Sequence, residues 1–275
     1  MRQFLSRVFP RRKARRVVKI TVLGCGSSGG TPLVGPDGWA DIDRDDPRNR
    51  RRRPSILVET DTTRILVDTS PDLRNQLLDA NIWNIDAILF THAHADHVNG
   101  IDDIRSLNYQ KGEPIDAYSN AFTLDILKER FAYVFEPYRT RNPQFWRPCL
   151  TPHVIDGPFS IGDIEIQPFD QEHGRMPSLG FRFGRFAYST DVKTLPETAF
   201  ELLDGIAVWI VDALGEKPHP THSHVDQTLD WIARIGPKRA ILTHLGHRTD
   251  YARLADRLPA GVEPGYDGMV IRITE

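Results

Sequence analysis

Residues 91–97 read Thr-His-Ala-His-Ala-Asp-His, and they directly follow the apolar run Ile-Asp-Ala-Ile-Leu-Phe at 85–90. Alternate side chains of an extended backbone point the same way, so His92 and His94 project toward one point. If a helix begins near Asp96, that carboxylate and His97 face a second point close by. Imidazole and carboxylate groups suit Zn²⁺, Mn²⁺ or Fe²⁺. The stretch therefore predicts two neighbouring cation sites at the end of a strand.

Two cations need more ligands than one heptad supplies, so further His or Asp residues are expected where other strands end. His173 follows the apolar run at 163–169, Asp191 ends Phe-Ala-Tyr-Ser-Thr-Asp, and His244 ends Arg-Ala-Ile-Leu-Thr-His. Asp68 likewise ends Arg-Ile-Leu-Val-Asp. Any one of these alone is more often a solvated polar residue at a strand end. Together with the 91–97 stretch they predict a binuclear metal site.

The rest of the chain has the pattern of an α/β protein. Short apolar, β-branched runs predict strands at 18–23, 55–59, 64–68, 86–90, 163–169, 181–189, 207–212, 239–244 and 269–273. Helical patterns lie between several of them, at 70–81 with Ser70 as the expected cap, and at 224–236 with a Gly stop. Strands interleaved with helices indicate an α/β architecture. We expect a single domain over 17–275, with a helical, aromatic-rich insertion at about 102–158 whose aromatics pack on helix faces.

Composition narrows the classes of function. The 275 residues are 40% hydrophobic with a formal charge of −2, which is ample for one core and gives no general argument for nucleic-acid affinity. No apolar run approaches the roughly 20 residues of a membrane span. Cys25 and Cys149 are expected to be reduced thiols in a cytoplasmic protein. Residues 1–16, with seven Arg or Lys and no acid, are expected to be a basic flexible tail, a targeting peptide being the alternative.

A glycine-rich stretch at 24–29 formally matches the GxGxxG pattern of dinucleotide-binding proteins. Such a site needs a helix that opens at once, so that its amides meet the pyrophosphate. Here Gly-Thr-Pro-Leu-Val-Gly-Pro follows at 30–36, which cannot start a regular helix. The glycines are instead expected to allow a tight turn and a close approach of backbone beside a site.

The chain resembles the metallo-β-lactamase superfamily, and more closely its phosphodiesterase branch, which holds the carbon–phosphorus lyase cyclic phosphodiesterase and the tRNA 3′-processing endonucleases. The phrases that carry this resemblance are LGCGSSGGTP (23–32), NRRRRPSILVET (49–60), LVDTSPDLRNQLL (66–78), THAHADHVNGIDDIR (91–105), EHGRMPSLGFRFG (172–184), YSTDV (188–192) and LTHLGH (242–247). They span nearly the whole chain after the basic tail. The fold implied is an αββα sandwich with the metal site at one edge of its two sheets.

The resemblance also implies roles for residues. His92, His94 and His173 would hold one metal, and Asp96, His97 and His244 the other, with Asp191 bridging. Asp68 would accept a hydrogen bond from a ligand imidazole. The cofactors implied are two divalent ions per chain, zinc or manganese. Relatives of the cyclic phosphodiesterase type often bind a separate structural zinc through cysteines after the glycine-rich loop, but residues 31–54 contain no cysteine.

Two neighbouring cations can activate a water that they share and clamp a phosphodiester during in-line attack. We therefore expect a phosphodiesterase that acts on small or cyclic phosphodiesters through a metal-bridging hydroxide, with Asp96 and Asp191 as catalytic ligands. The leaving alkoxide needs a proton, and His222 in His-Pro-Thr-His-Ser-His (219–224) is the favoured donor, ahead of His224 and His219. Asp212 is expected either to orient His222 or to make a structural hydrogen bond. His153 and His247 are expected to be loop residues.

Other functions remain open from the sequence. A tRNA 3′-processing endoribonuclease would draw support from the arginine run at 48–53, but no long Gly- and basic-rich arm is present to grip tRNA. A thioester or lactone hydrolase would use the same metal centre. A metal-binding regulatory protein without turnover is the non-enzyme alternative. The expected partner is a small phosphodiester substrate, with no membrane, nucleic acid not favoured, and a homodimer left open.

Overall fold

The computed structural model describes residues 16–138 and 147–274, and within them two seven-stranded sheets pack face to face. The first sheet has the order β14-β1-β2-β3-β4-β5-β6. Its strands are β1 (Val17–Gly24), β2 (Ser55–Glu59), β3 (Arg64–Val67), β4 (Ala87–Leu89), β5 (Ile115–Ser119), β6 (Leu150–Val154) and β14 (Val270–Thr274). The second has the order β13-β12-β11-β10-β9-β8-β7. Its strands are β7 (Phe159–Ile161), β8 (Ile164–His173), β9 (Met176–Phe183), β10 (Phe186–Ser189), β11 (Val208–Asp212), β12 (Arg239–Thr243) and β13 (Val262–Pro264).

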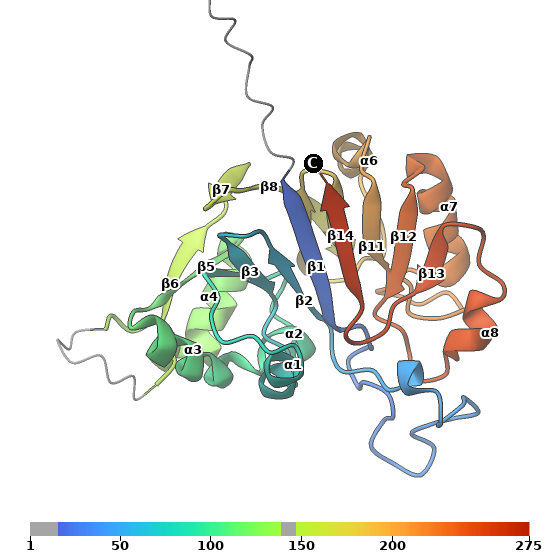
Figure 1. The fold of residues 1–275 in the computed structure, drawn as a ribbon, viewed down its shortest axis with the longest axis horizontal. Coiled ribbons are helices and arrows are strands. Elements are labelled where there is room, and N and C mark those ends of the chain that lie inside the picture. The colour runs from blue at the N-terminus through green and yellow to red at the C-terminus, as the bar shows by residue number, and fades with distance from the viewer. Residues whose placement is uncertain (1–15, 139–146, 275) are drawn as a thin grey trace, which may run out of the picture.

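Helices cover the outer faces of this pair of sheets, which makes four layers (Figure 1). The first group comprises α1 (Leu73–Asp79), α2 (Ala95–Val98), α3 (Ile104–Lys111), α4 (Ala121–Arg130) and α5 (Ala132–Phe135). The second comprises α6 (Glu197–Leu203), α7 (Val225–Ile235) and α8 (Tyr251–Ala255). Short 3₁₀ turns lie at η1 (Pro47–Asn49) and η2 (Ile101–Asp103). The predicted αββα sandwich is confirmed.

Apolar side chains point to both faces of each sheet, and this explains why each sheet is covered on both faces. In β2, Ile56 and Val58 enter the core between the sheets, while Leu57 enters the core under the first group of helices. In β11, Ile210 enters the core between the two sheets, while Trp209 enters the core under the second group of helices. Strands with apolar residues at every position are typical of sheets buried on both faces. Three apolar cores therefore separate the four layers.

Several boundaries differ from the sequence predictions. The run 181–189 forms two strands, because Gly184 takes a φ of +54° and reverses the chain between β9 and β10. The segment expected as a helical insertion does hold helices, but β5 and β6 within it extend the first sheet in parallel register. Its aromatics Phe145 and Trp146 lie outside the described residues.

The two predicted helices are present, with different starts. Helix α1 begins at Leu73, two residues after the Ser-Pro pair, and the Ser70 hydroxyl accepts a hydrogen bond from the Asp72 amide while it donates to the Gln76 side chain. Helix α7 ends as predicted, at Gly236 with a φ of +66°. None of the helices in 16–138 and 147–274 has the length and apolar character needed to cross a bilayer. The expected basic tail lies outside the described residues, apart from Arg16.

Candidate metal centre

The topology brings the ends of several strands to one edge of the sandwich. Strands β3 and β4 run parallel in the first sheet, as do β10, β11 and β12 in the second. Strand β8 shares the direction of β10, because each is antiparallel to β9. The residues at or just after these carboxyl ends are Asp68, the 91–97 stretch, His173, Asp191, Asp212 and His244. The structure brings together all seven residues that the sequence proposed as metal ligands.

The first group contains His92, His94, His173 and Asp191, whose ligand atoms all lie within 4.8 Å of one another. His94 Nδ1 lies 2.9 Å from His92 Nε2 and 3.1 Å from His173 Nε2. Asp191 Oδ2 lies 3.6 Å from His92 Nε2 and 3.5 Å from His173 Nε2. Three imidazole nitrogens and one carboxylate oxygen thus converge on one point.

The second group contains Asp96, His97, His244 and the same Asp191. Asp191 Oδ1 lies 3.0 Å from His97 Nε2 and 3.4 Å from His244 Nε2. Asp96 Oδ2 lies 3.4 Å from each of those two nitrogens. The two oxygens of Asp191 therefore face two different groups of ligands, which is the arrangement that a bridging carboxylate needs.

Hydrogen bonds on the outer side of the rings aim the inner nitrogens at the centre. His97 Nδ1 donates to Asp68 Oδ2 at 2.7 Å, and His173 Nδ1 donates to the Thr221 carbonyl at 2.7 Å. A ring that donates from Nδ1 presents the lone pair of Nε2 inward when neutral. His97 Nε2 is buried and makes no hydrogen bond with the described residues. In the neutral ring, the Nε2 lone pair points between the carboxylates of Asp96 and Asp191, and this arrangement fits a divalent cation.

The pKa values of the histidines shift in opposite directions in the two groups. Burial lowers the pKa of His92 well below its usual value, and it also lowers the pKa values of His94 and His173. These rings are therefore held in the neutral form that binds metal. Burial acts the same way on His97, but the carboxylates of Asp191, Asp96 and Asp68 outweigh it and raise its pKa well above the usual value. That second group is a concentration of negative charge which a cation would neutralise.

Three residues of the centre have a left-handed backbone. The φ angles are +64° at Asp68, +52° at Asp191 and +56° at His244, and only two other non-glycine residues of the described chain, Ala40 and Asn81, share this conformation. The left-handed region costs a non-glycine residue about 1–2 kcal/mol. Local strain of this kind concentrates at functional sites, where the surrounding structure enforces it.

Replacing Asp68 by asparagine is expected to weaken metal binding about 10- to 100-fold, because outer partners of ligand histidines contribute that much to affinity. The Asp68 carboxylate is fully buried and accepts hydrogen bonds from His97, from the Thr91 amide and from the Thr91 hydroxyl. Competition with a metal chelator measures the change. Asp116→Asn is the matched control, because Asp116 forms a similar pair with His153 at 2.8 Å outside the centre. Equal affinities in both variants would exclude the role given to Asp68.

A histidine–aspartate pair stands beside the two groups. His222 Nδ1 donates to Asp212 Oδ2 at 2.9 Å, and His222 Nε2 lies 3.9 Å from Asp191 Oδ2. Asp212 is fully buried and also accepts a hydrogen bond from the Val192 amide. Asp212 therefore fulfils both interpretations: its bond to His222 orients that ring, and its bond to the Val192 amide is structural.

The other histidines take no part in the two groups. The ring centroid of His219 lies 5.3 Å from that of His222, and His219 Nδ1 bonds with the Thr221 hydroxyl. His224 is the residue that precedes α7, and its Nδ1 is buried without a hydrogen-bond partner in the described chain. His153 lies on β6 rather than in a loop.

The glycine-rich loop packs closely beside the His244 segment. A Cβ at Gly24 would lie 2.0 Å from the Arg53 carbonyl oxygen, so a side chain cannot be accommodated there. The Leu245 amide donates to the Cys25 carbonyl, and the Ser27 amide donates to the Leu245 carbonyl. The expected close approach of backbone is confirmed. The next helical turn along the chain is η1, at Pro47–Asn49.

The arginine run at 48–53 is engaged within the protein. Arg48, Arg52 and Arg53 form ion pairs with Asp46, Asp79 and Asp72 at 2.7, 2.6 and 3.1 Å. The buried Arg51 donates to Asn49 and to the Thr249 carbonyl, and the Arg50 guanidinium lies over the Trp39 ring.

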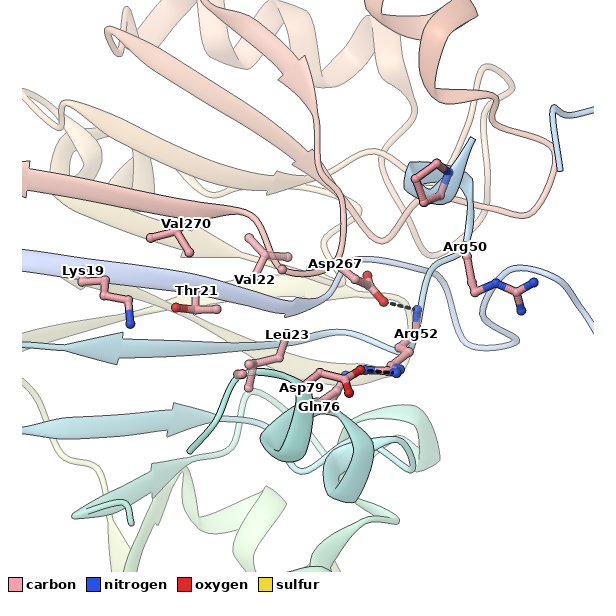
Figure 2. Close-up of a pocket in the computed structure, with 13 residues that line it drawn as sticks. Lys19, Thr21, Val22, Leu23, Arg50, Arg52, Gln76, Asp79, Asp267 and Val270 are labelled. Carbon is pink, nitrogen blue, oxygen red and sulfur yellow. Dashed lines mark hydrogen bonds and ion pairs between the residues drawn. The ribbon is translucent and has the colours of Figure 1, made fainter. Parts of the chain in front are cut away.

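Figure 2 shows Arg52 bridging Asp79 and Asp267 at a cavity of about 400 Å³ beside β1. None of the seven candidate ligands lines that cavity. These contacts join the arginine run to neighbouring residues of the protein, while Arg48 and Arg50 stay exposed.

Thr91 has a role in the centre that the sequence pattern did not predict. Its amide and hydroxyl both bond to Asp68, and its hydroxyl lies 3.0 Å from His92 Nδ1. Thr91 therefore links the two ligand groups through their outer hydrogen bonds. Its position directly before the first histidine of the motif was the available signal.

Comparison with known proteins agrees with this geometry. Residues 63–245 match the family described as the beta-lactamase superfamily domain. The crystal structure of a diphosphatase from the PhnP family is 33% identical with a TM-score of 0.85, and the alignment covers 95% of this chain and 99% of that chain.

Curated relatives match over part of their own length. An octanoyltransferase of Porphyromonas gingivalis is 35% identical over 94% of this chain and 52% of that protein. A ribonuclease Z of Bradyrhizobium diazoefficiens is 33% identical over 50% of this chain and 46% of that protein. The chain thus spans about half the length of these curated relatives.

The resemblance drawn from the sequence phrases is thereby confirmed. The match to the superfamily domain covers most of the chain, and the match to the diphosphatase covers nearly all of both chains. The chain belongs to the metallo-β-lactamase superfamily and, within it, to the PhnP family.

Proposed function

We propose that the protein is a binuclear metal-dependent phosphodiesterase that acts on small or cyclic phosphodiesters. The observation that carries this proposal is the division of Asp191, whose Oδ2 faces His92 and His173 while its Oδ1 faces His97 and His244. A single carboxylate shared in this way would serve as a ligand to two neighbouring cations.

In this proposal His92, His94 and His173 would hold one divalent ion, Asp96, His97 and His244 would hold the other, and Asp191 would contribute to both. Zinc and manganese suit this set of nitrogen and oxygen ligands. When bound, the pair supplies an activated water and positive charge for the phosphoryl oxygens. Asp68 and Thr221 keep the ligand rings oriented through their outer nitrogens.

His222 acts as the proton donor to the leaving alkoxide. Its Nδ1 is held by Asp212, so the Nε2 edge is directed toward the centre, 3.9 Å from Asp191 Oδ2. An imidazole held in this orientation can pass a proton to the leaving oxygen as the phosphorus–oxygen bond breaks.

The relatives support phosphorus–oxygen chemistry. A diphosphatase and a ribonuclease Z both break bonds at phosphorus, and the diphosphatase aligns over nearly the whole chain. The octanoyltransferase is about twice as long as the part matched here, so its name gives no activity to this chain.

The proposal is tested by metal analysis of the purified protein together with a panel of substrates. We expect about two transition-metal ions per chain and hydrolysis of bis-p-nitrophenyl phosphate that a chelator stops and added Zn²⁺ or Mn²⁺ restores. The panel includes a thioester, a lactone and a precursor tRNA. Turnover of the thioester or lactone alone would replace the proposal, and cleavage of the tRNA with tight binding at physiological salt would favour the endoribonuclease.

A further inference from the structure

An arginine from another helix bonds to the backbone between two of the candidate ligands. Ala93 is fully buried between His92 and His94. Arg130, the last residue of α4, donates from Nη1 to the Ala93 carbonyl at 2.5 Å. A buried carbonyl needs a donor, so this bond holds the segment that carries the two histidines.

The Arg130 side chain is exposed in spite of this bond. Its one hydrogen bond within the described chain is the one to Ala93, and no carboxylate there lies within 4.0 Å of it. By contrast, Arg52, Arg53 and Arg64 are all paired with acids. Arg130 therefore keeps an uncompensated positive charge and unused N–H groups.

The position of this charge relative to the centre follows from the backbone. Standard bond lengths place Arg130 Nη1 within about 6 Å of the His94 Cα atom. His94 is the partly exposed member of its ligand group, while His92, His173 and Asp191 are buried. The guanidinium thus lies beside the backbone segment that carries His92 and His94, next to the partly exposed ligand.

We propose that Arg130 is a substrate-binding residue that selects anionic substrates, an inference that rests on the phosphodiesterase activity proposed above. One nitrogen of its guanidinium stays on the Ala93 carbonyl. The remaining N–H groups bind an anionic oxygen of the phosphodiester, since the planar fork of arginine matches phosphate geometry. Carboxylic esters and lactones, which lack that charge, gain nothing from this contact.

The test compares Arg130→Ala, Arg130→Gln and Arg130→Lys in the metal-loaded protein. Glutamine keeps an N–H donor for Ala93 without the charge, and lysine keeps the charge. Calorimetry with inorganic phosphate and the KM for bis-p-nitrophenyl phosphate are the measurements. We expect the Ala and Gln variants to weaken phosphate binding and raise KM about tenfold, the usual effect of one charge-assisted hydrogen bond. The Lys variant recovers part of this loss.

Two controls separate this role from a structural one. Lys128→Ala, in the same helix, removes a charge whose ion pair within the described residues is with Asp125, and it should behave as the wild type. Bound metal is measured in every variant and is expected to stay unchanged in Arg130→Gln. An Arg130→Gln variant with wild-type phosphate affinity and KM would overturn the proposal, because the bond to Ala93 would then be the whole role of the residue.

The same measurements distinguish failure of this inference from failure of the proposed function. An active wild type whose KM and phosphate affinity do not respond to Arg130→Ala contradicts only the role of Arg130. A wild type without activity on any diester, but with phosphate affinity that depends on Arg130, contradicts the phosphodiesterase and leaves the anion-binding role supported.

Discussion

Replacing Asp191 by alanine is expected to abolish turnover, with a fall in kcat/KM of at least about 10⁴-fold, or about 5 kcal/mol of transition-state stabilisation. The reason is that one side chain contributes to both ligand groups, through Oδ1 and Oδ2 separately. The variant loses a carboxylate ligand from each site and should retain less than one metal ion per chain. Metal analysis after gel filtration and the rate with bis-p-nitrophenyl phosphate check both parts.

Asp191→Asn is the informative control for this variant. The amide keeps the size of the side chain and one carbonyl oxygen, so the fold is preserved while one of the two shared oxygens is lost. We expect the asparagine variant to bind one ion tightly and to lose most of its activity. If Asp191→Ala kept two ions and more than a tenth of the wild-type rate, Asp191 would not be shared between two cations.

Replacing His222 by alanine is expected to lower kcat about 10²- to 10⁴-fold for a substrate with a poor leaving group, the usual contribution of a general acid. Bound metal should remain at the wild-type level, because His222 lies outside the two ligand groups that share Asp191. The loss should be much smaller with bis-p-nitrophenyl phosphate, whose leaving group needs no proton. A nucleoside cyclic phosphate and the nitrophenyl diester, compared side by side, measure this difference.

The neighbouring histidines supply the controls for His222. His219→Ala and His224→Ala should keep most of the rate, since neither side chain bonds to Asp212. Asp212→Asn should lower the rate in the same leaving-group-dependent way as His222→Ala, but by less. Full activity of the His222 variant on the cyclic phosphate would remove its role as an acid.

The candidate site was predictable because its residues follow strands whose patterns are strong. His173, Asp191 and His244 each end an apolar run, and parallel strands place such ends at one edge of a sheet. The short strands β5 and β6 were missed for different reasons. In β5 the buried side chains are those of Ile115, Ala117 and Ser119, of which only Ile115 is large and apolar. In β6 only Leu150 is buried, so the alternation that signals a strand is absent.

Contacts that depend on the tertiary fold were beyond the reach of the sequence. The bond from Arg130 to the Ala93 carbonyl joins residues 37 positions apart, and no motif marks Arg130. The acidic partners of Arg52 and Arg53 are Asp79 at the end of α1 and Asp72 just before it, and no sequence pattern joins these residues to the arginine run. The Ser70 hydroxyl makes the cap-type bond to the Asp72 amide, but the regular helix begins only at Leu73, a boundary that the sequence pattern did not locate.

The most direct test of the two-cation centre is anomalous diffraction from crystals grown with Mn²⁺. We expect two anomalous peaks about 3.5–4 Å apart, one between His92, His94 and His173, the other between Asp96, His97 and His244, with an oxygen of Asp191 reaching each. A single peak at saturating Mn²⁺, or two peaks that both lie away from Asp191, would contradict the binuclear centre.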